Sequence, residues 1–200
     1  MPVSPRFPDR LRLPLDFDPA GLAADMANFA QRQWIEHFVK QNYDGDWSVI
    51  PLRGPAGASH PVQMIYSDPG RSDFADTPML AGSRTFRAVL DAFACPLHAV
   101  RLLRLTPGSV IKEHHDNDLC FEQGMVRIHI PVVTNDGVDF RLNGTRCVMA
   151  AGSSWYLRLS DPHSVANRGA TDRVHLVIDA VVNDWVGALF ERAAARGEAA

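Results

Sequence analysis

The pattern of hydrophobic and polar positions divides the chain into two parts. From Ala99 onward, short β-branched or alternating runs follow one another and are separated by turn signals. The runs are AVRLLRL, TPGSVIKEH, MVRIHIPVV, VDFRL, TRCVMA, SWYLRL, HSVAN and RVHLVIDAVV. Two of the turns, Asn135-Asp136-Gly137 and Asn143-Gly144, are of hairpin type, because glycine tolerates positive φ. The second part is therefore predicted to be mainly β, as an antiparallel barrel or double-sheet jelly roll.

The first part has a mixed pattern that predicts helices and loops. Asp18-Pro19 resembles an N-cap followed by the first helical position, and apolar residues then recur at helical spacing. That helix is expected to continue, with breaks, toward Phe38. Further elements are expected as a strand at Trp47–Leu52, a long loop at Arg53–Ala81 and helices at Ser83–Ala94 and Asp184–Arg196.

These elements predict one domain with flanking helices. Residues 1–98 are expected to form a helical and loop region packed on the barrel, residues 99–183 the jelly-roll core, and residues 184–200 a C-terminal helix. A chain of 200 residues is long enough to bury one core of this kind.

Composition and charge narrow the functional classes. The hydrophobic fraction of 46% and the charged fraction of 22% are ordinary for a globular domain. A net charge of −3 gives no reason to expect a nucleic-acid partner or an anionic membrane surface. We expect neither a spanning helix nor a secretory signal, because the N-terminus is interrupted by prolines and charges.

The cysteines indicate neither disulfides nor a zinc site. Cys95, Cys120 and Cys147 are odd in number and widely spaced, so they form neither a disulfide framework nor a C-x-x-C zinc pattern. We interpret them as small buried residues. Their spacing favours a reducing cytoplasm as the location of the protein.

The densest run of potential metal ligands lies at residues 112–118, KEHHDND. In an extended segment, side chains at positions i and i+2 point to the same side, so His114 and Asp116 can meet one ion. His163, just after the run SWYLRL, is the natural third donor. Two histidines and one carboxylate make the facial triad of non-haem iron(II) oxygenases, which leaves the opposite face open.

Other interpretations of this run remain open from spacing alone. His-x-Asp is a short pattern that also occurs in solvated polar turns, and His115 with Asp118 is an alternative pair. A calcium loop of the EF-hand type is disfavoured, because the required glycine and glutamate are missing. Zinc hydrolase chemistry is disfavoured as well, because the chain has no H-E-x-x-H motif.

An arginine ten residues after His163 adds to the pattern. Arg173 opens the apolar run RVHLVIDAVV, so a buried guanidinium there would need a partner. One interpretation is an ion pair with Asp172 or Asp179. The functional interpretation is a bidentate clamp for a ligand carboxylate, such as the distal carboxylate of 2-oxoglutarate.

At this point the sequence resembles the aspartyl/asparaginyl β-hydroxylase family, which includes bacterial proline cis-hydroxylases. The resemblance rests on four motifs in the family's order, at Arg104–Asp116, Val126–Pro131, Trp155–Asn167 and Arg173–Asp179. The N-terminal half matches loosely, chiefly through Trp47–Pro55.

The resemblance implies a double-stranded β-helix of cupin-like type and an iron(II)- and 2-oxoglutarate-dependent dioxygenase that uses O2. His114, Asp116 and His163 would be the catalytic iron ligands, and Arg173 would hold the distal carboxylate of 2-oxoglutarate. Arg127 and His129 match the family's R-x-H strand, near the metal-chelating end of the co-substrate. The vertebrate-type members have glycine in place of the triad carboxylate, so Asp116 aligns this chain with the members that use a full triad.

The expected reaction is hydroxylation of an amino acid, or of an aspartyl, asparaginyl or prolyl residue in a peptide, with succinate and CO2 as co-products. The lack of a docking domain or membrane anchor tilts the expectation toward a small molecule or short peptide. The alternatives are a non-catalytic cupin-like metal or ligand sensor and a cupin-type isomerase or lyase. Substrate-binding candidates are Arg101, Arg141, Arg158 and the segment Gln63–Arg71, whereas Trp155 is expected in the core or the pocket wall.

Overall fold

The computed structural model describes residues 5–66 and 70–197, which form thirteen strands and five α-helices. The strands are β1 (Arg10–Asp16), β2 (Ile35–Glu36), β3 (Tyr43–Asp44), β4 (Trp47–Pro55), β5 (Phe74–Asp76), β6 (Leu97–Leu105), β7 (Val110–His114), β8 (Met125–Val133), β9 (Val138–Leu142), β10 (Thr145–Cys147), β11 (Ser153–Leu157), β12 (His163–Asn167) and β13 (Arg173–Val181). The helices are α1 (Pro19–Ala27), α2 (Pro61–Ile65), α3 (Pro78–Ala81), α4 (Arg84–Asp91) and α5 (Asp184–Arg196), with three 3₁₀ turns at Gln31–Gln33, Lys40–Asn42 and Phe121–Gln123.

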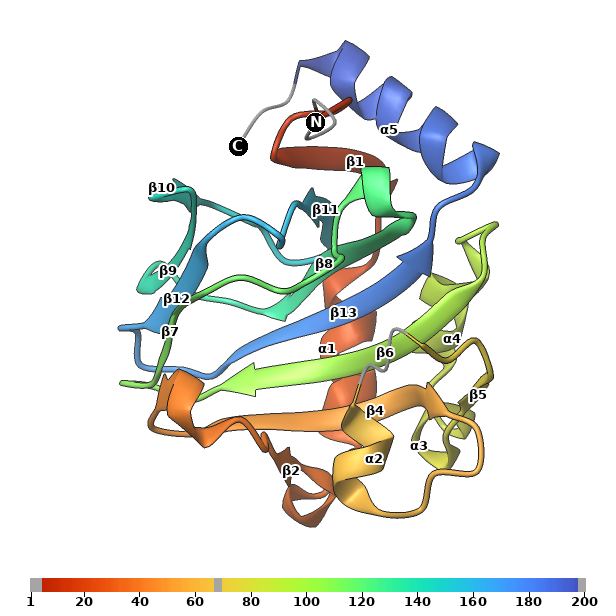
Figure 1. Cartoon of the computed structure of the whole chain (residues 1–200). Coiled ribbons are helices and arrows are strands. Elements are labelled where there is room, and N and C mark those ends of the chain that lie inside the picture. The colour runs from red at the N-terminus through yellow and green to blue at the C-terminus, as the bar shows by residue number, and fades with distance from the viewer. Residues whose placement is uncertain (1–4, 67–69, 198–200) are drawn as a thin grey trace.

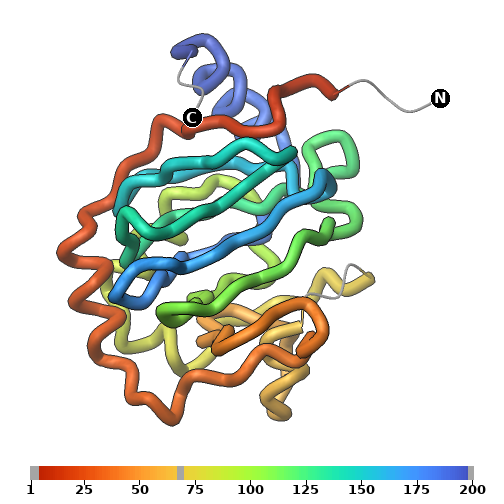
Figure 2. The backbone as a smooth tube through the Cα atoms, turned by 90° about the vertical axis from the view of Figure 1, so that its left-hand side faces the viewer, coloured from red at the N-terminus to blue at the C-terminus, as the bar shows by residue number. Residues whose placement is uncertain are grey.

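The strands form two antiparallel sheets. The large sheet has the order β1-β11-β8-β13-β6-β4-β2, with β5 paired to β4, and it crosses the middle of Figure 1. The small sheet has the order β10-β9-β12-β7-β3, and its strands lie one below another at the front of Figure 2. Two packed sheets with these antiparallel connections confirm the predicted double-stranded β-helix.

The strict alternation of strand side chains gives the large sheet two different faces. Val126, Ile128, Leu176 and Ile178 belong to a core that also contains α1, α4 and α5. The intervening positions of β6, β8 and β13 point the other way, between the sheets, because neighbouring strand residues alternate in direction. Those positions carry Arg101, Arg127, His129, Arg173, His175 and Asp179, all but Arg127 buried. The fold thus directs a set of charged side chains into the space between the two sheets.

Helices α1, α3, α4 and α5 pack on the apolar face of the large sheet, whereas Ile65 of α2 packs with Leu103 and Val177 on the other face. Helix α1 begins as predicted, because the Asp18 side chain accepts hydrogen bonds from the backbone N–H groups of Ala20 and Gly21. It ends at Ala27 rather than continuing toward Phe38, because the chain turns to pair β2 with β4. The C-terminal helix α5 has the predicted bounds, and no helix in the described residues is both long and apolar enough to cross a membrane.

The first 98 residues contain more strand than predicted. The unpredicted strand β1 pairs with β11 at the edge of the large sheet, where Pro14 is tolerated because an edge strand has unpaired backbone groups. Its Leu11 and Leu13 are buried. Since β1 and β4 belong to the same sheet as β6, β8 and β13, residue 98 is not a boundary between structural layers.

The expected loop at Arg53–Ala81 contains short elements instead. Strand β4 continues to Pro55, and α2, β5 and α3 follow. Arg53 holds this segment together, because it donates hydrogen bonds to the carbonyls of Leu97 and Phe74 and pairs with Asp76. Elements of three to five residues are too short to show a period in the sequence.

Candidate metal centre

Two histidines face each other across neighbouring strands of the small sheet. His114 ends β7, His163 begins β12, and the two are direct partners in the antiparallel pairing of these strands. Their ring centroids lie 4.3 Å apart. Directly opposed residues of an antiparallel pair project from the same face, so the strand register itself brings the two imidazoles together.

Both rings present the same nitrogen to the space between them. The Nδ1 of His114 lies 2.7 Å from the carbonyl of Lys112, and the Nδ1 of His163 lies 3.0 Å from the carbonyl of Asp161. A carbonyl only accepts, so Nδ1 carries a hydrogen in both rings, and in the neutral form of each ring the free lone pair is on Nε2. Burial lowers the pKa of His163 to about 4, which keeps this ring neutral at pH 7. His163 is therefore in the form that binds metal ions.

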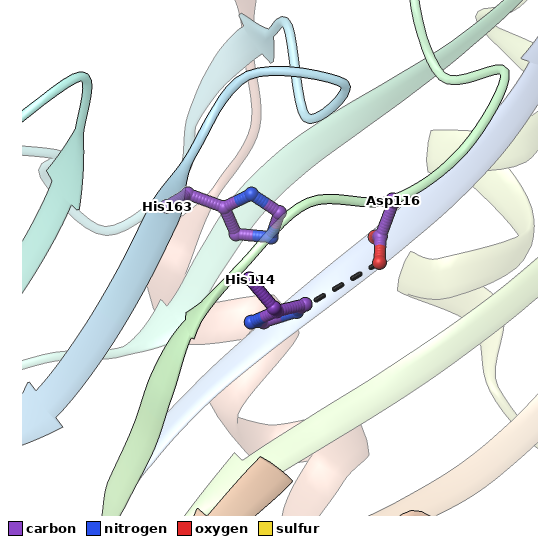
Figure 3. A group of neighbouring side chains, drawn as sticks. All are labelled: His114, Asp116 and His163. Atoms are coloured by element: carbon purple, nitrogen blue, oxygen red, sulfur yellow. Dashed lines mark ion pairs between the residues drawn. The ribbon is translucent and has the colours of Figure 1, made fainter.

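Asp116 completes the group from just beyond the end of β7. Its backbone N–H donates to the carbonyl of Leu159, and its Oδ1 lies 3.7 Å from the Nε2 of His114. The second oxygen, Oδ2, accepts a hydrogen bond of 2.7 Å from Arg127. One oxygen of the carboxylate is thus held by Arg127, and the other is near His114, to which Figure 3 draws a dashed line.

The geometry of the three side chains fits a metal ion. One potential ligand atom from each of His114, Asp116 and His163 lies within 4.8 Å of the others. Two atoms that bind one ion with bonds of about 2.1 Å lie at most about 4 Å apart, so small side-chain rotations close the set around a metal. Two imidazoles and one carboxylate suit iron(II), among other transition metals. Within the described part of the chain, the alternative pair of His115 and Asp118 joins no such group.

Arg127 connects this group to a buried carboxylate. Its guanidinium donates to both oxygens of Asp179, at 2.6 and 2.9 Å, as well as to Asp116. Arg101 donates to the same Asp179 at 2.8 Å. Burial opposes the charged form of Arg127, but Asp179 and Asp116 outweigh it and raise the pKa of the guanidinium. Positive and negative groups therefore alternate in the series Arg101, Asp179, Arg127 and Asp116.

Arg173 has no such partner. It is almost fully buried, and among the described residues no carboxylate forms an ion pair with it. Asp179, one of the carboxylates considered for it, instead binds Arg101 and Arg127. Burial lowers the pKa of Arg173 to about 9, and its Nε has no hydrogen-bond partner. An unpaired buried guanidinium costs free energy that an anionic ligand would recover.

Two further histidines surround this arginine. The Nδ1 of His175 lies 2.9 Å from an NH2 nitrogen of Arg173 and 3.3 Å from the Nδ1 of His129. The Nε2 of His129 is buried without a hydrogen-bond partner. His175 was not predicted as a site residue, although its position two residues after Arg173 in the same strand signals that both face the same side.

All these groups except His175 and Asp179 line one cavity of about 740 Å³ between the two sheets. Its rim contains the aromatic side chains of Phe38 and Tyr66, whose ring centroids are 6.0 Å apart. Its walls include Ile111, Leu159 and Phe140, the last lying below the Arg173 guanidinium. The cavity thus places a metal-binding group and an unpaired cation in one enclosure, which is the size of a small-molecule site.

The substrate-binding candidates separate into two groups. Arg101 lines the cavity, and so do Ile65 and Tyr66 from the segment Gln63–Arg71. Arg141 lies outside it and binds Asp139, while Arg158 donates to the carbonyl of Phe7 near the N-terminus. Those two arginines therefore do not face the cavity. Trp155 is buried in a hydrophobic cluster with Trp47, Phe140 and Leu157, as expected.

Several known proteins resemble this chain in sequence or in fold. The family model described as aspartyl/asparaginyl beta-hydroxylase matches residues 22–182. A curated relative, the L-proline cis-4-hydroxylase of Rhizobium meliloti, is 25% identical over 169 residues. That match covers 82% of this chain and 57% of the relative, so the chain spans less than two thirds of the relative's length.

Two solved structures share the fold. One is an oxidoreductase of the 2OG-Fe(II) oxygenase family from Burkholderia pseudomallei, with a TM-score of 0.50, 15% identity and coverage of 81% of this chain and 77% of the other. The second is a prolyl-4-hydroxylase from Pseudomonas putida, with a TM-score of 0.50, 14% identity and coverage of 88% and 93%. At these identities the likeness concerns the backbone arrangement.

Proposed function

Because the chain belongs to the aspartyl/asparaginyl β-hydroxylase family, we propose that it is an iron(II)- and 2-oxoglutarate-dependent dioxygenase. His114, Asp116 and His163 hold the metal in this proposal. The observation that carries it is the combination, in one cavity, of three converging ligand atoms with a buried guanidinium that lacks a counter-charge. A metal site alone would need no such cation.

The polar residues of the cavity have different roles in this proposal. Bound iron(II) would supply activation of O2 coupled to decarboxylation of 2-oxoglutarate, which yields succinate and CO2. Arg173 binds the distal carboxylate of 2-oxoglutarate, for which its planar guanidinium is suited. Arg127 orients Asp116 through their hydrogen bond, and His129 lies close to Arg173 on the co-substrate side. The apolar walls exclude water from the reacting atoms.

The substrate class follows from the relative and from the cavity. The relative's name describes hydroxylation of L-proline, and we propose a free amino acid, or an aspartyl, asparaginyl or prolyl residue of a short peptide, for this chain. The aromatic rim at Phe38 and Tyr66 suits the aliphatic part of such a substrate.

The test measures co-substrate turnover. Anaerobic protein with iron(II) and 2-oxoglutarate is expected to show weak metal-to-ligand charge-transfer absorption, and air with candidate amino acids is expected to release succinate. Replacement His163→Ala is expected to abolish both signals, whereas His115→Ala, at an exposed neighbour of the ligands, is the matched control.

A second pair of variants tests the co-substrate site. Arg173→Leu is expected to leave metal binding intact and to raise the KM for 2-oxoglutarate, whereas Arg141→Leu, outside the cavity, is expected to change neither. Unchanged turnover in Arg173→Leu contradicts the assignment of that arginine. Binding of metal and 2-oxoglutarate without any turnover, across a panel of amino acids and peptides, favours the non-catalytic sensor instead.

A further inference from the structure

A group of three buried polar residues includes two, Arg173 and His129, that line the cavity together with the candidate metal ligands. Arg173 and His175 come from β13, and His129 comes from the neighbouring strand β8. Arg173 and His175 are 1% exposed and His129 is 4% exposed, so water does not satisfy their polar atoms. Their hydrogen bonds to one another must therefore be consistent.

The hydrogen positions in this group follow from donor and acceptor chemistry. A guanidinium only donates, so the Nδ1 of His175, 2.9 Å from the NH2 of Arg173, must be an acceptor without a hydrogen. The same Nδ1 lies 3.3 Å from the Nδ1 of His129. Two bare nitrogens would repel each other, so the Nδ1 of His129 carries a hydrogen and donates it. His175 thereby fixes the tautomer of His129.

In this tautomer the Nε2 of His129 presents a lone pair, which cannot donate a hydrogen bond to an anion. When the Nδ1 of a neutral imidazole is protonated, the Nε2 has only a lone pair. The Nε2 of His129 is buried, has no partner and belongs to a residue that lines the cavity. A carboxylate at pH 7 also has only lone pairs, so the two repel unless the imidazole gains a proton.

The charges around His129 explain why the ring is neutral without a ligand. Burial lowers the pKa of His129 well below its usual value, and the cations Arg173 and Arg127 lower it further. His163 acts in the same direction, whereas Asp179 raises the pKa. His175 accepts from His129 in either protonation state, and the other neighbours, Phe140 and Trp155, do not titrate. A bound dianion adds two negative charges and reverses this balance.

We propose that His175 sets the tautomer of His129 so that binding of the dicarboxylate co-substrate beside Arg173 is accompanied by uptake of one proton on the Nε2 of His129. The proposal rests on the proposed function for the identity of the co-substrate. His129 then donates two hydrogen bonds, one to His175 and one to the ligand carboxylate. His175 is a positioning residue in this arrangement, because it acts through His129 and Arg173.

Calorimetry of co-substrate binding tests the proposal without turnover. The protein is loaded with manganese(II) beforehand, so that His114 and His163 stay unprotonated, and it is titrated with 2-oxoglutarate at one pH in buffers of different ionisation enthalpy. The dependence of the measured heat on the buffer gives the number of protons taken up. We expect uptake of about one proton by the wild type. Between the pKa of His129 in the free protein and its higher pKa in the complex, binding should weaken about tenfold for each unit by which the pH rises.

Variants at position 175 separate the positioning role from packing. His175→Asn keeps an acceptor near the position of Nδ1, so about one proton is expected. His175→Phe keeps the ring volume but removes the acceptor, which frees His129 to protonate Nε2 in its neutral form, so proton uptake is expected to vanish. His129→Gln is also expected to bind 2-oxoglutarate without proton uptake. This variant replaces His175→Phe in the test if His175→Phe does not fold. His98→Gln, which changes another cavity histidine outside this group, is expected to behave as the wild type.

The outcomes are distinct. Binding of 2-oxoglutarate to the wild type without proton uptake overturns this inference and leaves the proposed function standing. Full proton uptake in His175→Phe or in His129→Gln also overturns it, because the proton then resides elsewhere. No binding of 2-oxoglutarate to the manganese-loaded protein overturns the proposed function and this inference together.

Discussion

Two arginines on adjacent strands of the large sheet, the half-buried Arg127 and the buried Arg173, have opposite electrostatic surroundings. Arg127 on β8 donates to Asp179 and Asp116, and the pKa of its guanidinium is raised. Arg173 on β13 has no carboxylate partner among the described residues, and burial lowers its pKa to about 9. Both side chains point between the sheets and line the same cavity.

The difference indicates in which part of the cavity the protein neutralises its own charges. The surroundings of Arg127 are neutralised within the chain, so this region can be stable before any ligand arrives and can hold Asp116 in place. The surroundings of Arg173 retain a positive charge, so this region gains stability when an anion binds. A buried charge without a partner is therefore a better indication of a ligand than a buried ion pair.

Loss of a metal ligand is expected to have the largest effect on the Arg127 side. Asp116→Ala removes a ligand atom and the hydrogen-bond acceptor of Arg127, so iron(II) affinity should fall by more than the ~10–100-fold typical for a group that only orients a ligand. Equilibrium dialysis against iron(II) under anaerobic conditions measures this change. Asp118→Ala, at an exposed position of the same loop, is the control and should bind iron like the wild type.

The two arginines are next expected to differ in their contribution to stability. Asp179→Leu leaves the buried Arg101 without a counter-charge and leaves Arg127 with Asp116 alone, so it should lower the free energy of unfolding by about 3–5 kcal/mol. Arg173→Leu removes a charge that has no partner, so the metal-free protein should be as stable as the wild type or more stable. Urea unfolding of both variants measures the difference. A large destabilisation by Arg173→Leu contradicts the comparison.

A smaller effect on metal affinity is expected when lysine replaces Arg127, which keeps the positive charge but removes the planar guanidinium. Lysine cannot donate to Asp179 and Asp116 in the same geometry, so Arg127→Lys should lower metal affinity by ~10–100-fold with the fold retained. Circular dichroism and metal titration check the two parts of this prediction. Arg146→Lys, a surface arginine that lies outside the cavity, should leave both unchanged.

The smallest expected effect, when counted over one pH unit, is an acid dependence of stability at the cavity wall. Burial and the nearby Arg101 lower the pKa of His37 to about 3, below the ordinary histidine value of 6.5. Between these values the unfolded chain binds the extra proton, so stability is fully present above about pH 6.5 and is lost as the pH falls toward 3, by up to about 1.4 kcal/mol per pH unit. His37→Phe keeps a ring that can stack on Trp47 and should give a shallower acid dependence in urea unfolding of the metal-free protein. An equal slope in both proteins contradicts the prediction.

Most of the fold was predictable where the elements were long and regular. The strands from β6 to β13 and helix α5 have strong periodicity, and the structure contains them near the predicted positions. Strand β1 was missed because its two buried leucines lie among arginines and a proline, a pattern that sequence reasoning assigns to loops. Its partner β11 follows it by more than a hundred residues, and no local signal reports such a pairing.

The candidate site was partly predictable for a similar reason. The residues His114, Asp116 and His163 stand in short motifs, and the structure brings them together, although their role as metal ligands stays a prediction. The pairing of Asp179 with Arg127 was not visible, because alternation along β13 says which residues share a face but not which neighbour on β8 each contacts. The same holds for His175 and His129. Reducing cytoplasm as the location also stays a prediction.

The register between β7 and β12 has a consequence for how the protein matures. β12 pairs with β7 on one side and with β9 on the other, so a shift by one residue would turn His163 toward the opposite face while many backbone hydrogen bonds could re-form. A misaligned molecule would thus keep its sheet content but be unable to take up iron. Metal uptake during refolding therefore reports on correct strand alignment, which a spectroscopic measure of secondary structure would not detect.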